Sequence, residues 1–96
     1  MRDMLIDAIN NRRVLSFNYD GFHRVVEPHT VGKSTAGKDV LSCFQTEGGH
    51  VNPDHEWDLC EFSKIKQLNL TGNTFVGERP GYRRGDKRMV QIYAEL

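Results

Sequence analysis

Five residues make the clearest candidate binding group in this sequence: the aromatic Tyr19, Phe22 and Trp57, with Arg24 and Asp58. Aromatic rings suit stacking on a nucleobase, and a planar guanidinium suits paired hydrogen bonds to a phosphate or carboxylate. The same residue types also describe the core of a small β domain with one arginine that buries its stem and extends its head to solvent. Both interpretations of Arg24 stay open at this level.

A second candidate is a basic cluster near the C-terminus. Its cations are Arg79, Arg83, Arg84, Lys87 and Arg88, interrupted by Asp86 alone. An acidic cluster comes earlier in the chain: Asp54, Glu56, Asp58 and Glu61. Such segregation either brings the two segments together or leaves two patches for different partners. Arg83, Arg84 and Arg88 are therefore candidate nucleic-acid contacts, although the formal net charge of zero gives no global basic excess.

The sequence offers no catalytic or metal-binding constellation. Cys43 and Cys60 fall in alternating strand patterns without a flanking motif that would mark an activated nucleophile. Residues 32–34 read Gly-Lys-Ser, yet the rest of a phosphate-binding loop is missing. His50 and His55 have no second ligand pair at structural-zinc spacing. We expect a protein that is not an enzyme and binds no metal and no cofactor.

Apolar runs are short throughout the 96 residues. None is long enough for a transmembrane helix, and the first residues lack the pattern of a secretory signal. We therefore expect a cytoplasmic protein without a membrane partner, in which both cysteines are reduced thiols.

The candidate residues are positioned by a predicted hairpin over Val14–Pro28. Residues 14–19 alternate apolar and polar side chains, and Asp20-Gly21 is typical of a tight two-residue turn. The turn length sets the register, so the predicted cross-strand pairs are Tyr19 with Phe22, Phe17 with Arg24 and Leu15 with Val26. This register places Arg24 on the core-facing side, whereas a three-residue turn would move it.

Other elements follow from the same patterns. A helix is predicted over residues 1–13, strands over Val40–Gln45, Trp57–Phe62 and Ile65–Leu70, and a helix capped by Asp86 over Lys87–Glu95. The expected fold is mainly β: a single domain with a five-stranded barrel over residues 14–71, a helix at each end and a tail over residues 72–96. Its expected core contains Leu15, Phe17, Val26, Leu41 and Leu68.

The order of several short motifs resembles the WYL domain family in its compact stand-alone form. The motifs are Leu5 to Ile9, the strand ending at Tyr19, residues 24–28 (Arg-Val-Val-Glu-Pro), residues 37–41, Trp57 with Phe62 and Ile65, residues 79–82 (Arg-Pro-Gly-Tyr) and residues 85–89. The resemblance covers nearly the whole chain. Two places differ from the family pattern. At the tripeptide that names the family, this chain has Asp39-Val40-Leu41 and keeps only the leucine. Asp58 and Cys60 stand where the family usually has an arginine and a phenylalanine.

The resemblance implies a small Sm-like or SH3-like barrel that serves as a regulatory module in bacterial transcription regulators and phage defence. It further implies that Tyr19, Arg24 and the Trp57 region line a surface for a nucleotide-like ligand or single-stranded nucleic acid. The alternative is a protein-interaction module that forms a homo-oligomer or joins a larger complex through its C-terminal helix.

Overall fold

The computed structural model describes residues 1–49 and 56–96. Its elements in chain order are α1 (Arg2–Asn10), β1 (Arg13–Tyr19), β2 (Phe22–Ser34), β3 (Asp39–Gly48), β4 (Trp57–Glu61), the short 3₁₀ helix η1 (Phe62–Lys64), β5 (Lys66–Thr74) and β6 (Met89–Glu95). The mainly β prediction is confirmed. His50 and His55, considered above as metal ligands, lie outside the described residues, as does most of the predicted loop over residues 46–55.

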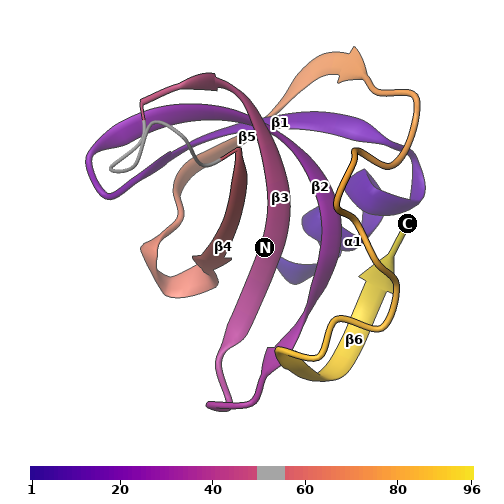
Figure 1. The fold of residues 1–96 in the computed structure, drawn as a ribbon. Coiled ribbons are helices and arrows are strands. Elements are labelled where there is room, and N and C mark those ends of the chain that lie inside the picture. Colours follow the sequence, from indigo (N-terminus) through magenta and orange to yellow (C-terminus); the bar gives the residue numbers. More distant parts are fainter. Residues whose placement is uncertain (50–55) are drawn as a thin grey trace.

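The strands form one antiparallel sheet in the order β4-β3-β2-β1-β5, with β6 added to β2. Figure 1 shows the sheet curling around the core. The predicted five-stranded closed barrel is wrong, because the sheet has six strands and its end strands β4 and β5 do not pair within the described residues. Instead, η1 connects β4 at one edge of the sheet to β5 at the other edge.

The hairpin between β1 and β2 has the predicted register. Its pairs are Tyr19 with Phe22, Phe17 with Arg24 and Leu15 with Val26. Asp20 and Gly21 both have positive φ, at 51° and 81°, which is the backbone of the expected two-residue turn. Of the predicted core residues, Leu15, Phe17, Val26 and Leu41 are fully buried, whereas Leu68 is only partly buried at the edge of the core.

The sequence leaves open whether the strand ends or bends at Pro28 or continues through residues 29–31, and in the structure β2 continues to Ser34. Pro28 pairs with Cys43 and Thr30 pairs with Ser42, so His29 is one extra residue on β2. Such a bulge tolerates a proline, because the ladder is interrupted there in any case. It leaves His29 without an opposite residue on β3 and buries its side chain completely.

The predicted C-terminal helix is wrong, because Met89–Glu95 forms β6 and pairs antiparallel with residues 30–34 of β2. Its apolar residues fit an alternating pattern as well as a helical one, and Val90 and Ile92 favour strands. Residues 30–34 of β2 lie beyond the part of β2 that pairs with β1. This edge of β2 is therefore unpaired by β1 and can form a ladder with β6. The alternative of an interaction through a C-terminal helix therefore has no helix to act through.

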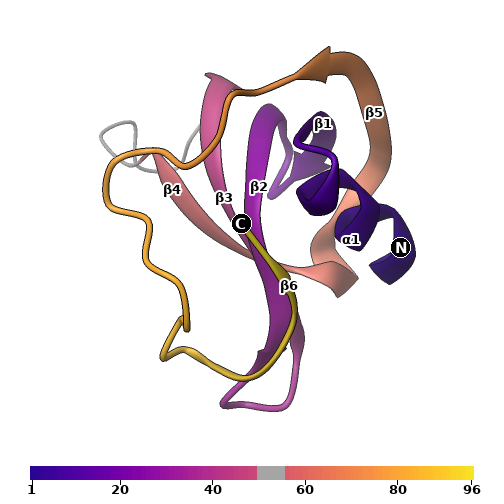
Figure 2. The same cartoon turned by 90° about the vertical axis from the view of Figure 1, so that its right-hand side faces the viewer.

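Helix α1 packs against β1, β2 and β6 (Figure 2) through the buried side chains Leu5, Ala8 and Ile9. The predicted amphipathic helix is confirmed, although it spans Arg2–Asn10 and not residues 1–13. Among the described residues, the helices are too short and too polar to cross a bilayer.

Close packing of β2 on β6 depends on Gly32. A Cβ atom at this position would overlap the carbonyl oxygen of Gln91 and lie 2.9 Å from the Met89 sulfur. Gly32→Ala is therefore expected to lower the free energy of unfolding in urea by about 1–3 kcal/mol. Gly77→Ala is the matched control, because its nearest atom would be 3.9 Å away, at Arg12. Equal losses for both variants would contradict this account of the β2–β6 contact.

Candidate functional site

Three of the first candidate residues meet inside the curled sheet. A nitrogen of the Arg24 guanidinium lies 3.2 Å from a carboxylate oxygen of Asp58, and their side chains are only 5% and 13% exposed. The guanidinium also lies 5.2 Å from the centre of the Tyr19 ring. The Tyr19 hydroxyl accepts the backbone N–H of Glu61 at 3.0 Å. The Arg24 side chain is thus almost completely buried, and its charge is matched by a carboxylate inside the protein.

The other two residues of that set lie elsewhere. Phe22 lies beside the hairpin turn, is 39% exposed, and its ring fits against Gly49 so closely that a side chain there would collide with it. Trp57 alternates with Asp58 along β4 and so projects from the outer face of the sheet, where its ring lies 5.4 Å from that of Phe44. The structure therefore does not bring Trp57 together with Arg24.

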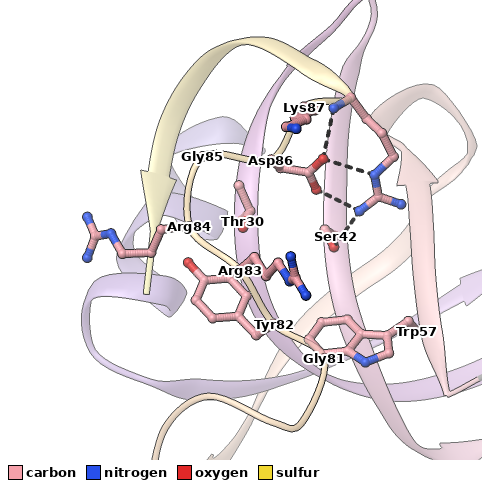
Figure 3. A pocket seen from close by; sticks show the side chains of 11 residues that line it. Thr30, Ser42, Trp57, Gly81, Tyr82, Arg83, Arg84, Gly85, Asp86 and Lys87 are labelled. Atoms are coloured by element: carbon pink, nitrogen blue, oxygen red, sulfur yellow. Dashed lines mark hydrogen bonds and ion pairs between the residues drawn. The ribbon is translucent and has the colours of Figure 1, made fainter.

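Trp57 instead lines a pocket of about 440 Å³ between the sheet and residues 75–88, which we call the tail loop. Figure 2 shows the tail loop running from the end of β5 past β4 to the start of β6. Figure 3 shows the pocket, whose lining consists of Thr30, Ser42, Trp57 and residues 81–88. Arg83, Arg84 and Arg88 all belong to this lining. The pocket thus unites one aromatic residue of the first candidate set with the whole predicted nucleic-acid-binding set.

Arg79 attaches the tail loop to the sheet. Its guanidinium forms a two-bond ion pair with the buried carboxylate of Glu27, at 2.8 and 2.9 Å. It also lies over the Phe44 ring, 4.7 Å from the centre. Hydrogen bonding to Glu27 raises the pKa of Arg79. This cation of the basic cluster is therefore structural.

The next three residues extend the same attachment. The indole N–H of Trp57 donates to the carbonyl of Pro80 at 3.1 Å. Gly81 has φ of 93° and lies so close to the indole that a Cβ atom would be 3.2 Å from its nitrogen. The hydroxyl of Tyr82 donates to the backbone carbonyl of Leu96 at 3.0 Å. The Arg-Pro-Gly-Tyr motif is thus the segment that closes the pocket over the sheet.

His29 lies beneath this segment and was missed by the sequence analysis. Its ring is packed against Trp57, Phe75 and Tyr82, with centroid distances of 4.8, 5.8 and 5.2 Å. Its Nε2 accepts the backbone N–H of Arg79 at 3.1 Å, and its Nδ1 lies 2.8 Å from the carbonyl of Glu27. A backbone amide can only donate, so the ring is neutral with its proton on Nδ1. The only sequence signal was a histidine directly after a proline within a strand.

Two of the four cations that line the pocket, Arg84 and Arg88, have ion-pair partners among the described residues. Arg88 binds Asp86 at 2.6 and 3.0 Å and donates to the Ser42 hydroxyl, and this hydrogen bonding lowers the pKa of Asp86. Arg84 pairs with Glu95 at 3.1 Å. Figure 3 shows Arg84 pointing away from the pocket and Arg83 pointing into it on the side of Trp57. Within the described residues, Arg83 makes no hydrogen bond or ion pair, so its charge is available to a ligand.

Cys43 and Cys60 are both free and buried. A hydrogen bond with Cys60, together with complete burial, raises the pKa of the Cys43 thiol, which disfavours the nucleophilic thiolate. No group of metal-ligating side chains gathers in the part of the chain that the structure describes. Comparison of the chain with protein-family models, curated proteins and solved structures gives no match.

Proposed function

We propose that this protein is a non-enzymatic, WYL-like binding module that takes a nucleotide-like ligand or the end of a nucleic-acid strand into the pocket beneath the tail loop. The observation that carries the proposal is Arg83, a cation without a protein partner among the described residues, directed into a cavity beside an indole ring. A guanidinium in this setting is suited to a phosphate, because its planar donors match phosphate oxygens.

The remaining lining supports an anionic ligand that carries a ring. Four cations line the pocket against one carboxylate, and that carboxylate, Asp86, is already paired with Arg88. The hydroxyls of Thr30 and Ser42 lie on the sheet side and add neutral hydrogen-bonding groups. A volume of about 440 Å³ falls in the usual range of small-molecule pockets. Trp57 and Tyr82 supply aromatic surface for a base.

The resemblance to WYL domains adds a role to this chemistry. The Arg-Pro-Gly-Tyr motif that contributes to the resemblance is also the segment that closes the pocket. We therefore assign to the module a sensing role of the kind that the family implies, in bacterial transcription regulation or phage defence. Under this proposal the pocket replaces the buried Arg24 region as the ligand site.

Arg83→Ala tests the proposal directly. Binding of a fluorescent six-nucleotide single strand with a 5′-phosphate should weaken by about 10-fold or more, since a hydrogen bond to a charged group contributes roughly 1.5–3 kcal/mol. Arg84→Ala, which removes an exposed cation already paired with Glu95, should change the affinity by less than about 5-fold. Fluorescence anisotropy at two salt concentrations measures both effects.

Two further probes identify the chemical group that the pocket recognises. One is the same strand with a 5′-hydroxyl in place of the phosphate, and the other is adenosine monophosphate. Preference for the phosphorylated end, shared by the mononucleotide, is the expected result. Equal losses in the two arginine variants would indicate diffuse charge attraction and contradict a site at Arg83. The proposal fails if neither phosphorylated probe binds the wild-type protein.

A further inference from the structure

His29 connects the sheet to the tail loop through both ring nitrogens. The Nδ1 proton is held by the Glu27 carbonyl on β2, and Nε2 accepts from the Arg79 amide on the tail loop. Protonation would place a second N–H on Nε2, facing the N–H of Arg79 across the same 3.1 Å. Two donors cannot share a hydrogen bond, so the imidazolium would lose this contact with the tail loop.

The charged groups around the ring do not compensate for this loss. On β2, the Glu27 carboxylate favours a positive ring, but both of its oxygens are already held by Arg79. On the tail loop, Glu78 favours the imidazolium and the charge of Arg79 opposes it, while Tyr82 contributes an uncharged ring. Trp57 on β4 and Phe75 on the tail loop add apolar surface. Burial is the largest influence, and it lowers the pKa of His29 below its ordinary value of 6.5.

We propose that His29 is a pH-sensitive switch whose protonation releases the tail loop from the sheet and opens the pocket. The released state, in which the ring meets water, binds a proton at an ordinary histidine pKa. The attached state does so only at lower pH. Attachment is therefore at full strength above about pH 6.5 and weakens as the pH falls below that value.

Linkage gives the size of the effect. Between pH 7.5 and pH 5, the ratio of attached to released protein should fall by up to about 30-fold, the limit for a site with a released pKa near 6.5 that stays neutral when attached. Release of the loop needs no ligand. The consequence that phosphate-bearing ligands bind less tightly at pH 5 rests on the function proposed above.

Nuclear magnetic resonance on the 96-residue protein without ligand tests the switch. Trp57 is the only tryptophan and its indole N–H contacts Pro80, so its resonance reports on tail-loop attachment. At pH 7.5 the ring nitrogens of His29 should show the neutral form protonated on Nδ1. As the pH is lowered below about 6.5, the indole resonance should move toward its solvent-exposed position in the same step in which His29 gains its proton.

Two variants separate His29 from the other histidines. His23→Gln removes an exposed histidine on the same strand and should leave the transition unchanged. His29→Gln offers a neutral acceptor and should abolish it. If His29→Gln does not fold, the coincidence of the two signals in wild-type protein and in His23→Gln decides the question.

Three results would overturn the switch. They are a proton on Nε2 at pH 7.5, an indole resonance that stays fixed while His29 titrates, and a transition that survives in folded His29→Gln. None of these measurements contains a ligand. Failure of phosphate binding would therefore refute the proposed function and leave the switch standing, and the reverse also holds.

Discussion

Phe17→Ala is expected to lower the free energy of unfolding by about 3–5 kcal/mol, the cost of deleting a fully buried aromatic side chain. Phe17 lies in the middle of β1 with no exposed surface. Its ring makes an edge contact with Tyr19, at 6.4 Å between centroids. Removing the ring leaves a cavity that neighbouring strands, held by ladders on both sides of β1, cannot fill.

Urea denaturation followed by circular dichroism measures this loss. Phe22→Ala is the matched control, because it deletes the same ring from a position that is 39% exposed. We expect the control to lose clearly less than Phe17→Ala. A loss below about 1 kcal/mol for Phe17→Ala, as at surface positions, would contradict the register of the hairpin.

Asp58→Ala should destabilise the protein by about 3–5 kcal/mol, the range for removing one partner of a buried ion pair. Because arginine side chains stay charged in proteins, the variant would leave a cation in a place where the Arg24 side chain is 5% exposed. Among the described residues, its Nε has no hydrogen-bond partner, so the loss of Asp58 would add to an existing deficit of hydrogen bonds. The same denaturation experiment measures the effect.

Two further variants test whether burial is the cause. Glu61→Ala removes a carboxylate from the same strand whose partners, Lys38 and Lys64, are both exposed, and it should cost less than about 1 kcal/mol. The double variant Arg24→Met with Asp58→Val replaces both charges by apolar groups and should lose less than Asp58→Ala alone. A double variant that is less stable than Asp58→Ala would refute a buried cation as the source of the loss.

Sequence patterns predicted the hairpin that contains Phe17, but they did not predict the ion pair between Arg24 and Asp58. The hairpin was predictable because it is local: alternation assigns the faces, and the two-residue turn assigns the pairs. The same reasoning placed Arg24 on the inner face. Its partner could not be predicted, because Asp58 is 34 residues away on a strand that pairs with neither strand of the hairpin.

The C-terminal segment shows why a pattern can be insufficient. The apolar residues of Met89–Glu95 are compatible with both a helical and a strand period, so local sequence does not select between them. The free edge of β2 beyond the end of β1 selects the strand, and that edge exists only after the sheet has formed. Closure likewise depends on whether β4 and β5 meet, which no local pattern specifies.

Local sequence patterns were enough to predict a mainly β chain, the hairpin with its register, most of the core and a cluster of cations near the C-terminus. The folded structure adds which of these cations are paired, because Arg79 meets Glu27 and Arg84 meets Glu95 only when separate segments come together. It also brought Trp57 and Arg83 to one pocket and placed His29 beneath the tail loop. Side-chain contacts across distant strands create these features, and a linear pattern of residue types does not contain them.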